Sequence, residues 1–449
     1  MKRILVAALT VFALCLAEAP HALAASPDLA YFIVDPKFDS LPGIPTQRYF
    51  GIENGAAYRI EVPPAWNGKL VLYAHGYRGT GNVLFVSDPA IRQYLVTHGY
   101  AWAASSYSKN FYEVRQGVID THALNDVFAR VTGQSPSSTY VTGHSMGGHI
   151  TGVLIEKFPN DYVGAMPMCG VMGDVRLFDY FLDYTLVAED LAGVPGVFPP
   201  QPDFMTAVVP KIKAGLGGPG YPVTLNEAGR ELRSVTEQLT GGVRPSFDAA
   251  YTFWGAGDFL FARYGDGKLG GVASGNVATN LSTVYRFGPG DDELSPAEEA
   301  LNATVLRVPP DPVARFFHGE DGLANVPPIS GSFQIPVLTI HTIGDLFVPF
   351  SMEQIYARRA GRHDRSDLLV QRAIRDVHHC GFAPEEEAAS FADLVNWVEG
   401  GDRPAGDELL DPETVAEPQF GCQFTLSTRA PYAACPPAPV AGDQGKSDH

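Results

Sequence analysis

The feature that most constrains the fold is a serine between a run of strand-forming residues and a helical pattern. Residues 140–142 favour a strand, residues 143–147 read Gly-His-Ser-Met-Gly, and apolar side chains in 148–158 recur at helical spacing. Strand, tight turn and helix are the context in which G-x-S-x-G predicts a nucleophile elbow with Ser145 at its apex. The flanking glycines are needed because this turn strains the serine backbone and leaves no room for a Cβ atom beside it.

Apolar runs before and after this turn predict a sheet that is buried on both faces. Continuous apolar strands alternating with helices indicate βαβ units with right-handed crossovers, hence a mostly parallel, doubly wound sheet with helices on both faces. We expect helices at about 82–97 and 114–131. The expected strands are 56–62, 69–75, 100–105, 140–142, 162–168, 335–342 and 368–374.

The alternation stops near residue 170 and resumes only at residue 335. Residues 171–332 are rich in glycine and proline, with short helical candidates at 226–239 and 296–303. A structureless loop of that length is implausible in a compact domain, so this stretch predicts an inserted cap or lid. Its aromatic residues either line an apolar pocket or pack within the cap. They are Phe253, Trp254, Phe259, Phe261 and Tyr264.

The N-terminus has the pattern of a signal peptide at residues 1–25. A basic start is followed by an apolar run over residues 4–16 and an A-x-A cleavage signal at 22–24. The apolar run is too short to span a bilayer, and Leu14 before Cys15 does not fit a lipoprotein signal. We therefore expect a secreted or periplasmic protein with no stable membrane anchor.

These boundaries divide the chain into five segments. We expect the signal peptide, a first core part at 26–170, the cap or lid at 171–332, a second core part at 333–400 and a partly disordered tail at 401–449. The formal net charge is −18 and basic residues form no cluster, so nucleic acid is not an expected partner. The sequence carries no signal for an oligomeric state.

Four cysteines remain after the signal peptide, an even number in an oxidising compartment. Cys422 and Cys435 close a short loop in the tail and form a natural pair. That leaves Cys169 with Cys380, either as a second disulfide or as two buried small side chains. The sequence contains no CxxC motif or His/Cys cluster that would indicate a metal site.

Acyl transfer by a serine needs a base to take its proton and an acid to orient that base. Ligands of open parallel sheets bind at the carboxyl ends of strands, so these partners should follow strands directly. Asp345 follows the strand at 335–342, and His379 follows the last strand at 368–374. The chain order Ser145, Asp345, His379 is the order that hydrolases of the elbow type use.

Two of these residues have alternatives. Asp174, which follows the strand ending at residue 168, is a second candidate acid, and His378 competes with His379 as the base. We favour Asp345 and His379. Structural roles are expected for three other histidines, which lie at strand ends or in the elbow: His75, His144 and His341.

Together, these motifs resemble the α/β-hydrolase superfamily over about residues 55–170 and 333–400. The resemblance implies an α/β-hydrolase fold with an inserted cap, and a triad of Ser145, Asp345 and His379. The residues that carry it are His75-Gly76, Gly143 to Gly147, Gly344-Asp345, Val348-Pro349 and His379 to Phe382.

The negative charge that develops during acyl transfer needs preorganised donors. In an elbow one donor is the backbone N–H after the nucleophile, here that of Met146, and the other comes from the loop after the strand at 69–75. Resemblance to H-G-x loops indicates the N–H of Tyr77. Tyr77 and Met146 also resemble the oxyanion pair of bacterial cutinase-like polyester hydrolases, which are shorter proteins without a cap.

Cys380 beside His379 resembles an arrangement in tannases and feruloyl esterases. In those enzymes a disulfide ties the residue after the histidine to a cysteine just before the serine. His144 occupies that place here, so the bridge cannot form in the same way. The resemblance implies that Cys169, at the end of the next strand, would serve instead.

The superfamily resemblance implies a secreted serine hydrolase that cleaves carboxylic esters through an acyl-enzyme intermediate. It implies no metal or organic cofactor, and a small-molecule or polymeric ester as the substrate. An amidase or peptidase would use the same triad and is an alternative interpretation of the sequence. A non-catalytic binding protein on a hydrolase scaffold is another. The sequence does not identify the ester or amide.

Overall fold

A computed structural model describes residues 30–245, 247–265, 272–290, 293–427, 429–430 and 435. The expected signal peptide at 1–25 lies outside the described residues, as does the end of the tail after residue 435. Among the helices of the described ranges, none has the length and apolar character needed to cross a membrane.

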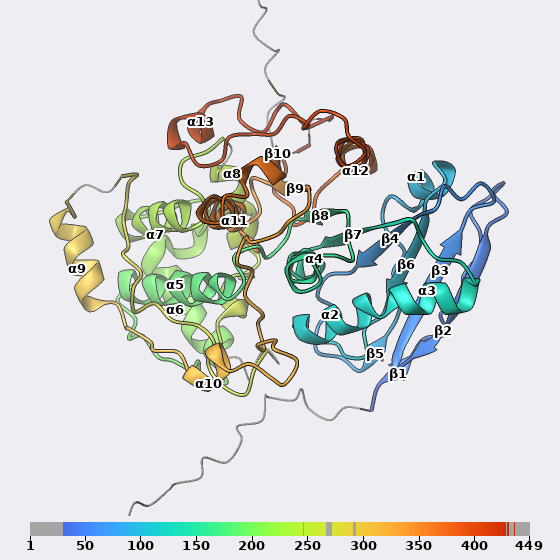
Figure 1. The fold of residues 1–449 in the computed structure, drawn as a ribbon. Coiled ribbons are helices and arrows are strands. Elements are labelled where there is room, and N and C mark those ends of the chain that lie inside the picture. Colours follow the sequence, from blue (N-terminus) through green and yellow to red (C-terminus); the bar gives the residue numbers. More distant parts are fainter. Residues whose placement is uncertain are drawn as a thin grey trace, which may run out of the picture.

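An eight-stranded sheet forms the centre of the molecule (Figure 1), in the order β10-β9-β8-β7-β4-β6-β3-β2. The β2–β3 and β3–β6 pairs are antiparallel and the other pairs are parallel. This mostly parallel order, with a serine turn after β7, is that of an α/β-hydrolase fold. The strands are β2 Gln47–Glu53, β3 Ala56–Val62, β4 Lys69–Ala74, β6 Ala101–Ser105, β7 Ser138–His144, β8 Gly164–Met168, β9 Val337–Thr342 and β10 Leu369–Ile374.

Alternate side chains of the central strands enter two hydrophobic cores, one on each face of the sheet. Leu70 and Leu72 pack with helices on one face, whereas Val71 and Tyr73 pack with helices on the other. Both faces are covered, which is why the central strands read as continuous apolar runs. The edge strand β2 has only exposed and half-buried positions.

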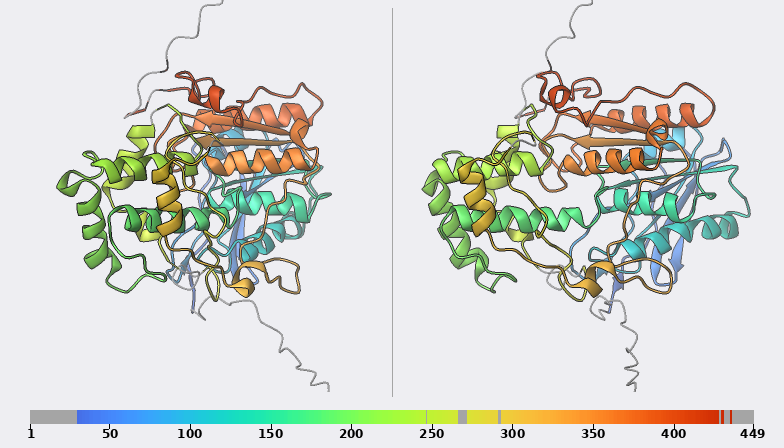
Figure 2. Two further views of the ribbon diagram at one scale, coloured as in Figure 1. Left: turned by 90° about the vertical axis from the view of Figure 1, so that its left-hand side faces the viewer. Right: turned by 60° about the vertical axis from the view of Figure 1, so that its left-hand side comes forward.

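The core helices lie in two layers on either side of this sheet (Figure 2). Residues of α2, α3, α4 and α11 contribute to one core, and residues of α1 and α12 to the other. Their bounds are α1 Arg92–Thr97, α2 Val114–His122, α3 Leu124–Thr132, α4 Met146–Lys157, α11 Ser351–Arg362 and α12 Pro384–Val398.

The helix expected at 82–97 is much shorter in the structure, because its first part is extended. Residues Val83–Leu84 form β5, which pairs with β1 (Phe32–Ile33) in a separate two-stranded sheet. Pro89 explains where the helix begins, because a proline disfavours helical backbone in the residue before it. The predicted helix at 114–131 divides into α2 and α3 at Ala123.

The chain between β8 and β9 is helical, and we refer to residues 171–332 as the cap segment. It lies to one side of the sheet in Figures 1 and 2, in green to yellow. Its elements are α5 Arg176–Leu191, η1 Phe204–Val208, α6 Val209–Leu216, η2 Gly218–Gly220, α7 Glu227–Leu239, α8 Phe247–Ala256, η3 Phe261–Arg263, α9 Pro296–Thr304 and α10 Pro312–Phe316.

The expectation of only short helices in this segment is wrong for α5, which has 16 residues. Most of its positions are buried, so it lacks the one-sided apolar stripe by which a surface helix is recognised.

The first part of the tail is also ordered and packs on the core. Leu409, Val415 and Phe420 are buried in a core cluster, with Val415 in the short helix α13 (Pro412–Ala416). The carboxylate of Asp407 accepts a hydrogen bond of 2.7 Å from the backbone N–H of Ala373 in β10. Residues 401–427 therefore cover the end of the sheet that β10 forms.

Candidate active site

Ser145 occupies a strained turn between β7 and α4. Its φ angle is 59°, in the left-handed region that side chains other than glycine rarely adopt. Its backbone N–H donates to the carbonyl oxygen of Met168 at 2.9 Å. A Cβ atom on Gly147 would lie 2.0 Å from the carbonyl oxygen of Ala74, so only glycine fits there. The turn thereby places the serine hydroxyl at the carboxyl end of the sheet, in the wall of a cavity.

Three side chains from three strand ends meet in a chain of hydrogen bonds. The Ser145 hydroxyl donates to Nε2 of His379 at 2.7 Å, and Nδ1–H of His379 donates to Oδ2 of Asp345 at 2.5 Å. The second carboxylate oxygen of Asp345 accepts the backbone N–H groups of Phe347 at 2.8 Å and Val348 at 3.0 Å. Asp345 is fully buried, so these donors hold its charge and its orientation.

The two alternative residues have other partners. The carboxylate of Asp174 accepts hydrogen bonds from Arg359 at 2.6 Å and from the backbone of Ile329 at 3.1 Å. His378 donates to Asp376 at 2.7 Å and packs its ring edge-to-face on Phe253. Asp174 therefore ties the start of the cap segment to α11, and His378 is bonded to Asp376 instead of to Ser145 or Asp345.

The three histidines with expected structural roles are all engaged elsewhere. His75 stacks on Tyr107 at 3.9 Å between ring centroids, and burial lowers its pKa to about 3, so it is neutral. His144 donates to Glu387 at 3.1 Å, and His341 donates to the carbonyl oxygen of Val348 at 2.8 Å.

A disulfide joins Cys169 to Cys380, the residue that follows His379, and it links residues 211 positions apart. Cys169 follows β8 and is fully buried. Within the described ranges, Cys169, Cys380 and His379 are the group close enough to share a metal ion, but both sulfurs are bonded to each other. A second disulfide joins Cys422 to Cys435 in the tail.

The loop after β4 passes next to the serine. A Cβ atom on Gly76 would lie 3.1 Å from the Cβ atom of Ser145, and Tyr77 lines the same cavity as Ser145. Met146 is the first residue of α4, where backbone N–H groups are free and the helix dipole is positive. The loop at Gly76 and Tyr77 and the start of α4 at Met146 thus both lie beside Ser145.

The cap segment contacts both loops that carry Asp345 and His379. The indole N–H of Trp254, on α8, donates to the carbonyl oxygens of Gly344 at 3.0 Å and Val377 at 2.8 Å. Gly344 precedes Asp345, and Val377 lies two residues before His379. One cap side chain thus connects the loop that carries Asp345 to the loop that carries His379.

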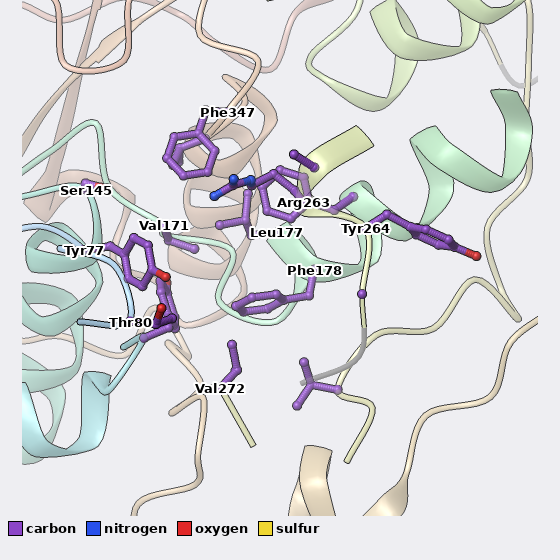
Figure 3. Close-up of a pocket in the computed structure, with 16 residues that line it drawn as sticks. Tyr77, Thr80, Ser145, Val171, Leu177, Phe178, Arg263, Tyr264, Val272 and Phe347 are labelled. Atoms are coloured by element: carbon purple, nitrogen blue, oxygen red, sulfur yellow. The ribbon is translucent and has the colours of Figure 1, made fainter. Parts of the chain in front are cut away.

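Ser145 opens into a cavity of about 260 Å³ between the core and the cap segment (Figure 3). Of the five aromatic residues named from the sequence, Tyr264 lines this cavity; Trp254 and Phe261 are buried in the core cluster. The sequence did not indicate the other walls, because α5 was not recognised. They include Val171, Leu177, Phe178, Phe181, Arg263 and Phe347.

No protein-family model matches the chain. It is 22% identical over 421 residues to an o-phthalyl amidase of Xanthobacter agilis, over 83% of this chain and 91% of that protein. Two similar solved structures are an acylaminoacyl peptidase of Pyrococcus horikoshii and an esterase from Aspergillus oryzae. The first is 10% identical with a TM-score of 0.38, over 83% of this chain and 44% of the peptidase. The second is 14% identical with a TM-score of 0.43, over 79% of this chain and 78% of the esterase.

Proposed function

We propose that this hydrolase of the α/β-hydrolase type is a serine hydrolase that cleaves carboxylic esters through an acyl-enzyme intermediate. The observation that carries the proposal is the hydrogen-bonded chain from Ser145 through His379 to Asp345 at the wall of a cavity. A nucleophile, a base and a buried acid in this geometry are the parts that acyl transfer requires.

In the proposed mechanism, the Ser145 hydroxyl attacks the ester carbonyl while Nε2 of His379 takes its proton. His379 then gives that proton to the departing alcohol, which leaves the acyl group on Ser145. A water molecule, deprotonated by His379, then attacks the acyl carbon. The bond from that carbon to Oγ of Ser145 breaks, the carboxylic acid leaves, and His379 returns the proton to Oγ. Asp345 keeps His379 in the tautomer that accepts at Nε2 and stabilises the imidazolium that forms.

The backbone N–H groups of Met146 and Tyr77 are the proposed donors to the oxyanion. In support, the loop at Gly76 lies against Ser145, and Met146 begins a helix. Each such donor contributes roughly 3–4 kcal/mol to stabilising the transition state. We propose that the cap segment closes the site on the side opposite the sheet.

An amide is the second candidate substrate, because the curated relative is an o-phthalyl amidase. Esters and amides pass through the same acyl-enzyme and differ in the leaving group. The choice is tested by kcat/KM on a matched pair, such as a 4-nitrophenyl ester and the 4-nitroanilide of one acid. A higher kcat/KM on the anilide would make this an amidase and overturn the ester assignment.

A fluorophosphonate probe tests whether the protein is a serine hydrolase at all. We expect one covalent adduct on Ser145 in folded wild-type protein, located by mass spectrometry of its peptides. Ser145→Ala should lose the adduct and reduce kcat by a factor on the order of 10⁶. Folded wild-type protein that forms no adduct would instead support the non-catalytic binding protein.

We also propose that residues 1–25 are removed on export to the periplasm or medium. Two disulfides among the described residues support an oxidising compartment. N-terminal sequencing of the protein recovered from a secreting host tests this. A mature chain that still begins at Met1 would contradict the proposal.

A further inference from the structure

Among the described residues, one charged side chain lines the cavity at Ser145, and it is a cation. Sixteen residues line this cavity, and Arg263 alone among them is charged. Arg263 ends η3 in the cap segment. Figure 3 shows its guanidinium group directed from the cap segment toward the side where Tyr77 and Ser145 lie. A substrate bound at Ser145 would therefore meet a positive charge across the cavity.

Arg263 has a buried donor that lacks a partner. Its Nε atom is buried without a hydrogen bond in the part of the chain that the structure describes. The guanidinium lies 4.7 Å from the centre of the Phe259 ring, which fixes one face of the group by a cation–π contact. A buried donor is normally hydrogen-bonded, so the described residues leave the hydrogen-bonding capacity of this guanidinium partly unused.

The positive charge of Arg263 affects the pKa of Tyr77, which lines the same cavity. Burial raises the pKa of the Tyr77 hydroxyl, and the positive charge of Arg263 acts in the opposite direction. The two side chains are thus close enough to interact electrostatically. Tyr77 follows the glycine that lies against Ser145, so the cation and the nucleophile belong to one small site.

The remaining walls are mostly apolar, with aromatic rings on several sides. Phe178 and Phe181 come from α5, and Phe347 comes from the loop after β9. Apolar walls lower the local dielectric, which strengthens an interaction between a cation and an anion. The planar fork of arginine pairs with two oxygens of a carboxylate or a phosphate, and the carboxylate is the smaller of these two groups.

We propose that Arg263 binds a carboxylate of the substrate, so that the preferred substrates carry a second, free carboxylate on a single aromatic acyl ring. This inference rests on the proposed function of Ser145. The cavity of about 260 Å³ is slightly below the ~300–1,000 Å³ typical of pockets for drug-sized ligands. The acyl group that enters the cavity is therefore small, and it has to carry both the carbonyl that Ser145 attacks and the anion that Arg263 binds.

Matched ester pairs test the proposal on the wild-type protein. The substrates are 4-nitrophenyl esters of 3- and 4-carboxybenzoate, compared with those of 3- and 4-carbamoylbenzoate, which are neutral and nearly the same shape. We expect kcat/KM to be about 10- to 100-fold higher for at least one carboxylate of the two pairs, as for a charge-assisted hydrogen bond. Equal kcat/KM values in both pairs, or a preference for the neutral esters, overturn the proposal.

Variants of Arg263 assign the preference to this residue. Arg263→Met keeps the apolar stem and should lose the carboxylate preference, measured as the ratio of kcat/KM between the two esters of each pair. Arg263→Lys should recover part of the preference. Arg230→Met is the matched control, because Arg230 is exposed on α7. Preference retained in Arg263→Met would assign the carboxylate to another residue and overturn the proposal.

A binding measurement separates this proposal from the proposed function. Titration calorimetry on Ser145→Ala uses 4-carbamoylbenzoate and its neutral analogue terephthalamide, neither of which needs to react. We expect tighter binding of the anion, and loss of that difference when Arg263→Met is added. No hydrolysis of any ester together with tighter anion binding would refute the hydrolase and keep the carboxylate site. Hydrolysis without a preference for the carboxylate esters would keep the hydrolase and refute the carboxylate site. Equal binding of the two ligands would also refute the carboxylate site.

Discussion

The disulfide between Cys169 and Cys380 should affect both stability and catalysis, because it joins two parts of the candidate site. Cys169 follows Met168, whose carbonyl oxygen accepts the backbone N–H of Ser145, and Cys380 follows His379. A continuous covalent and hydrogen-bonded path thus connects the nucleophile to its base. Replacing both cysteines with alanine removes that path without adding a polar group to a buried position.

The expected loss of stability follows from the length of the closed loop. For cysteines separated by 211 residues, the chain-entropy relation gives about 5 kcal/mol at 25 °C. The other disulfide, Cys422–Cys435, spans 13 residues and gives about 3 kcal/mol by the same relation. The double alanine variant of that tail pair is therefore the matched control. It removes a disulfide that contacts neither Ser145 nor His379 directly.

Urea unfolding followed by tryptophan fluorescence measures stability, and hydrolysis of a 4-nitrophenyl ester below the transition measures kcat. We expect the Cys169→Ala/Cys380→Ala variant to unfold at lower urea than the tail variant. Its kcat should fall by about 10²-fold, since a misplacement of a catalytic group by about 1 Å has that effect. The tail variant should keep kcat. Equal kcat values in both variants would refute the reasoning that this bond positions His379.

Three further perturbations test other contacts. Asp345→Asn should lower kcat by about 10⁴-fold, since it favours the wrong histidine tautomer. Asp174→Asn should lower stability and leave kcat within a few-fold of the wild-type value. The reverse result would make Asp174 the acid. Trp254→Phe removes the N–H that donates to the carbonyl oxygens of Gly344 and Val377. We expect the free energy of unfolding to fall by about 1–3 kcal/mol and kcat on small esters to fall as well. An unchanged kcat would show that these two loops need no support from the cap segment. Burial raises the pKa of Asp183 to about 8, above its value in the unfolded chain, so its contribution to stability is complete below pH ~4 and is lost as the pH rises through about 8. Between pH 4 and pH 9, the urea concentration at the midpoint of unfolding should fall less for Asp183→Asn than for the wild type. Parallel plots of this midpoint against pH for the two proteins would contradict the prediction.

Sequence reasoning located the residues whose positions depend on strand ends. Ser145 could be found because its strand, turn and helix are adjacent in the chain, and each imposes its own local pattern. Asp345 and His379 could be found because parallel strands bring their carboxyl ends to one edge. Asp174 also follows a strand, and its contact with Arg359 distinguishes its surroundings from those of Asp345. That contact joins residues 185 positions apart, which no local pattern reveals.

The cap segment could be anticipated as an insertion but not as a structure. The helix α5 is buried on nearly all sides by other cap helices and by the core, so its apolar residues show no helical stripe. Arg263 could not be selected from the sequence for a related reason. Its proposed role rests on its place in the wall of a cavity and on an Nε atom without a hydrogen bond among the described residues, and both depend on tertiary packing.

The hydrogen bonds of Trp254 bear on how such a protein can be redesigned. Exchanging residues 171–332 for a segment from another hydrolase is an obvious way to alter selectivity. The graft would also remove the indole N–H to which the carbonyl oxygens of Gly344 and Val377 are bonded. Both carbonyls would then need a new donor or access to water. A chimaera that keeps α8 and exchanges only α5 and the segment around η3 would alter the cavity walls while leaving that bridge in place.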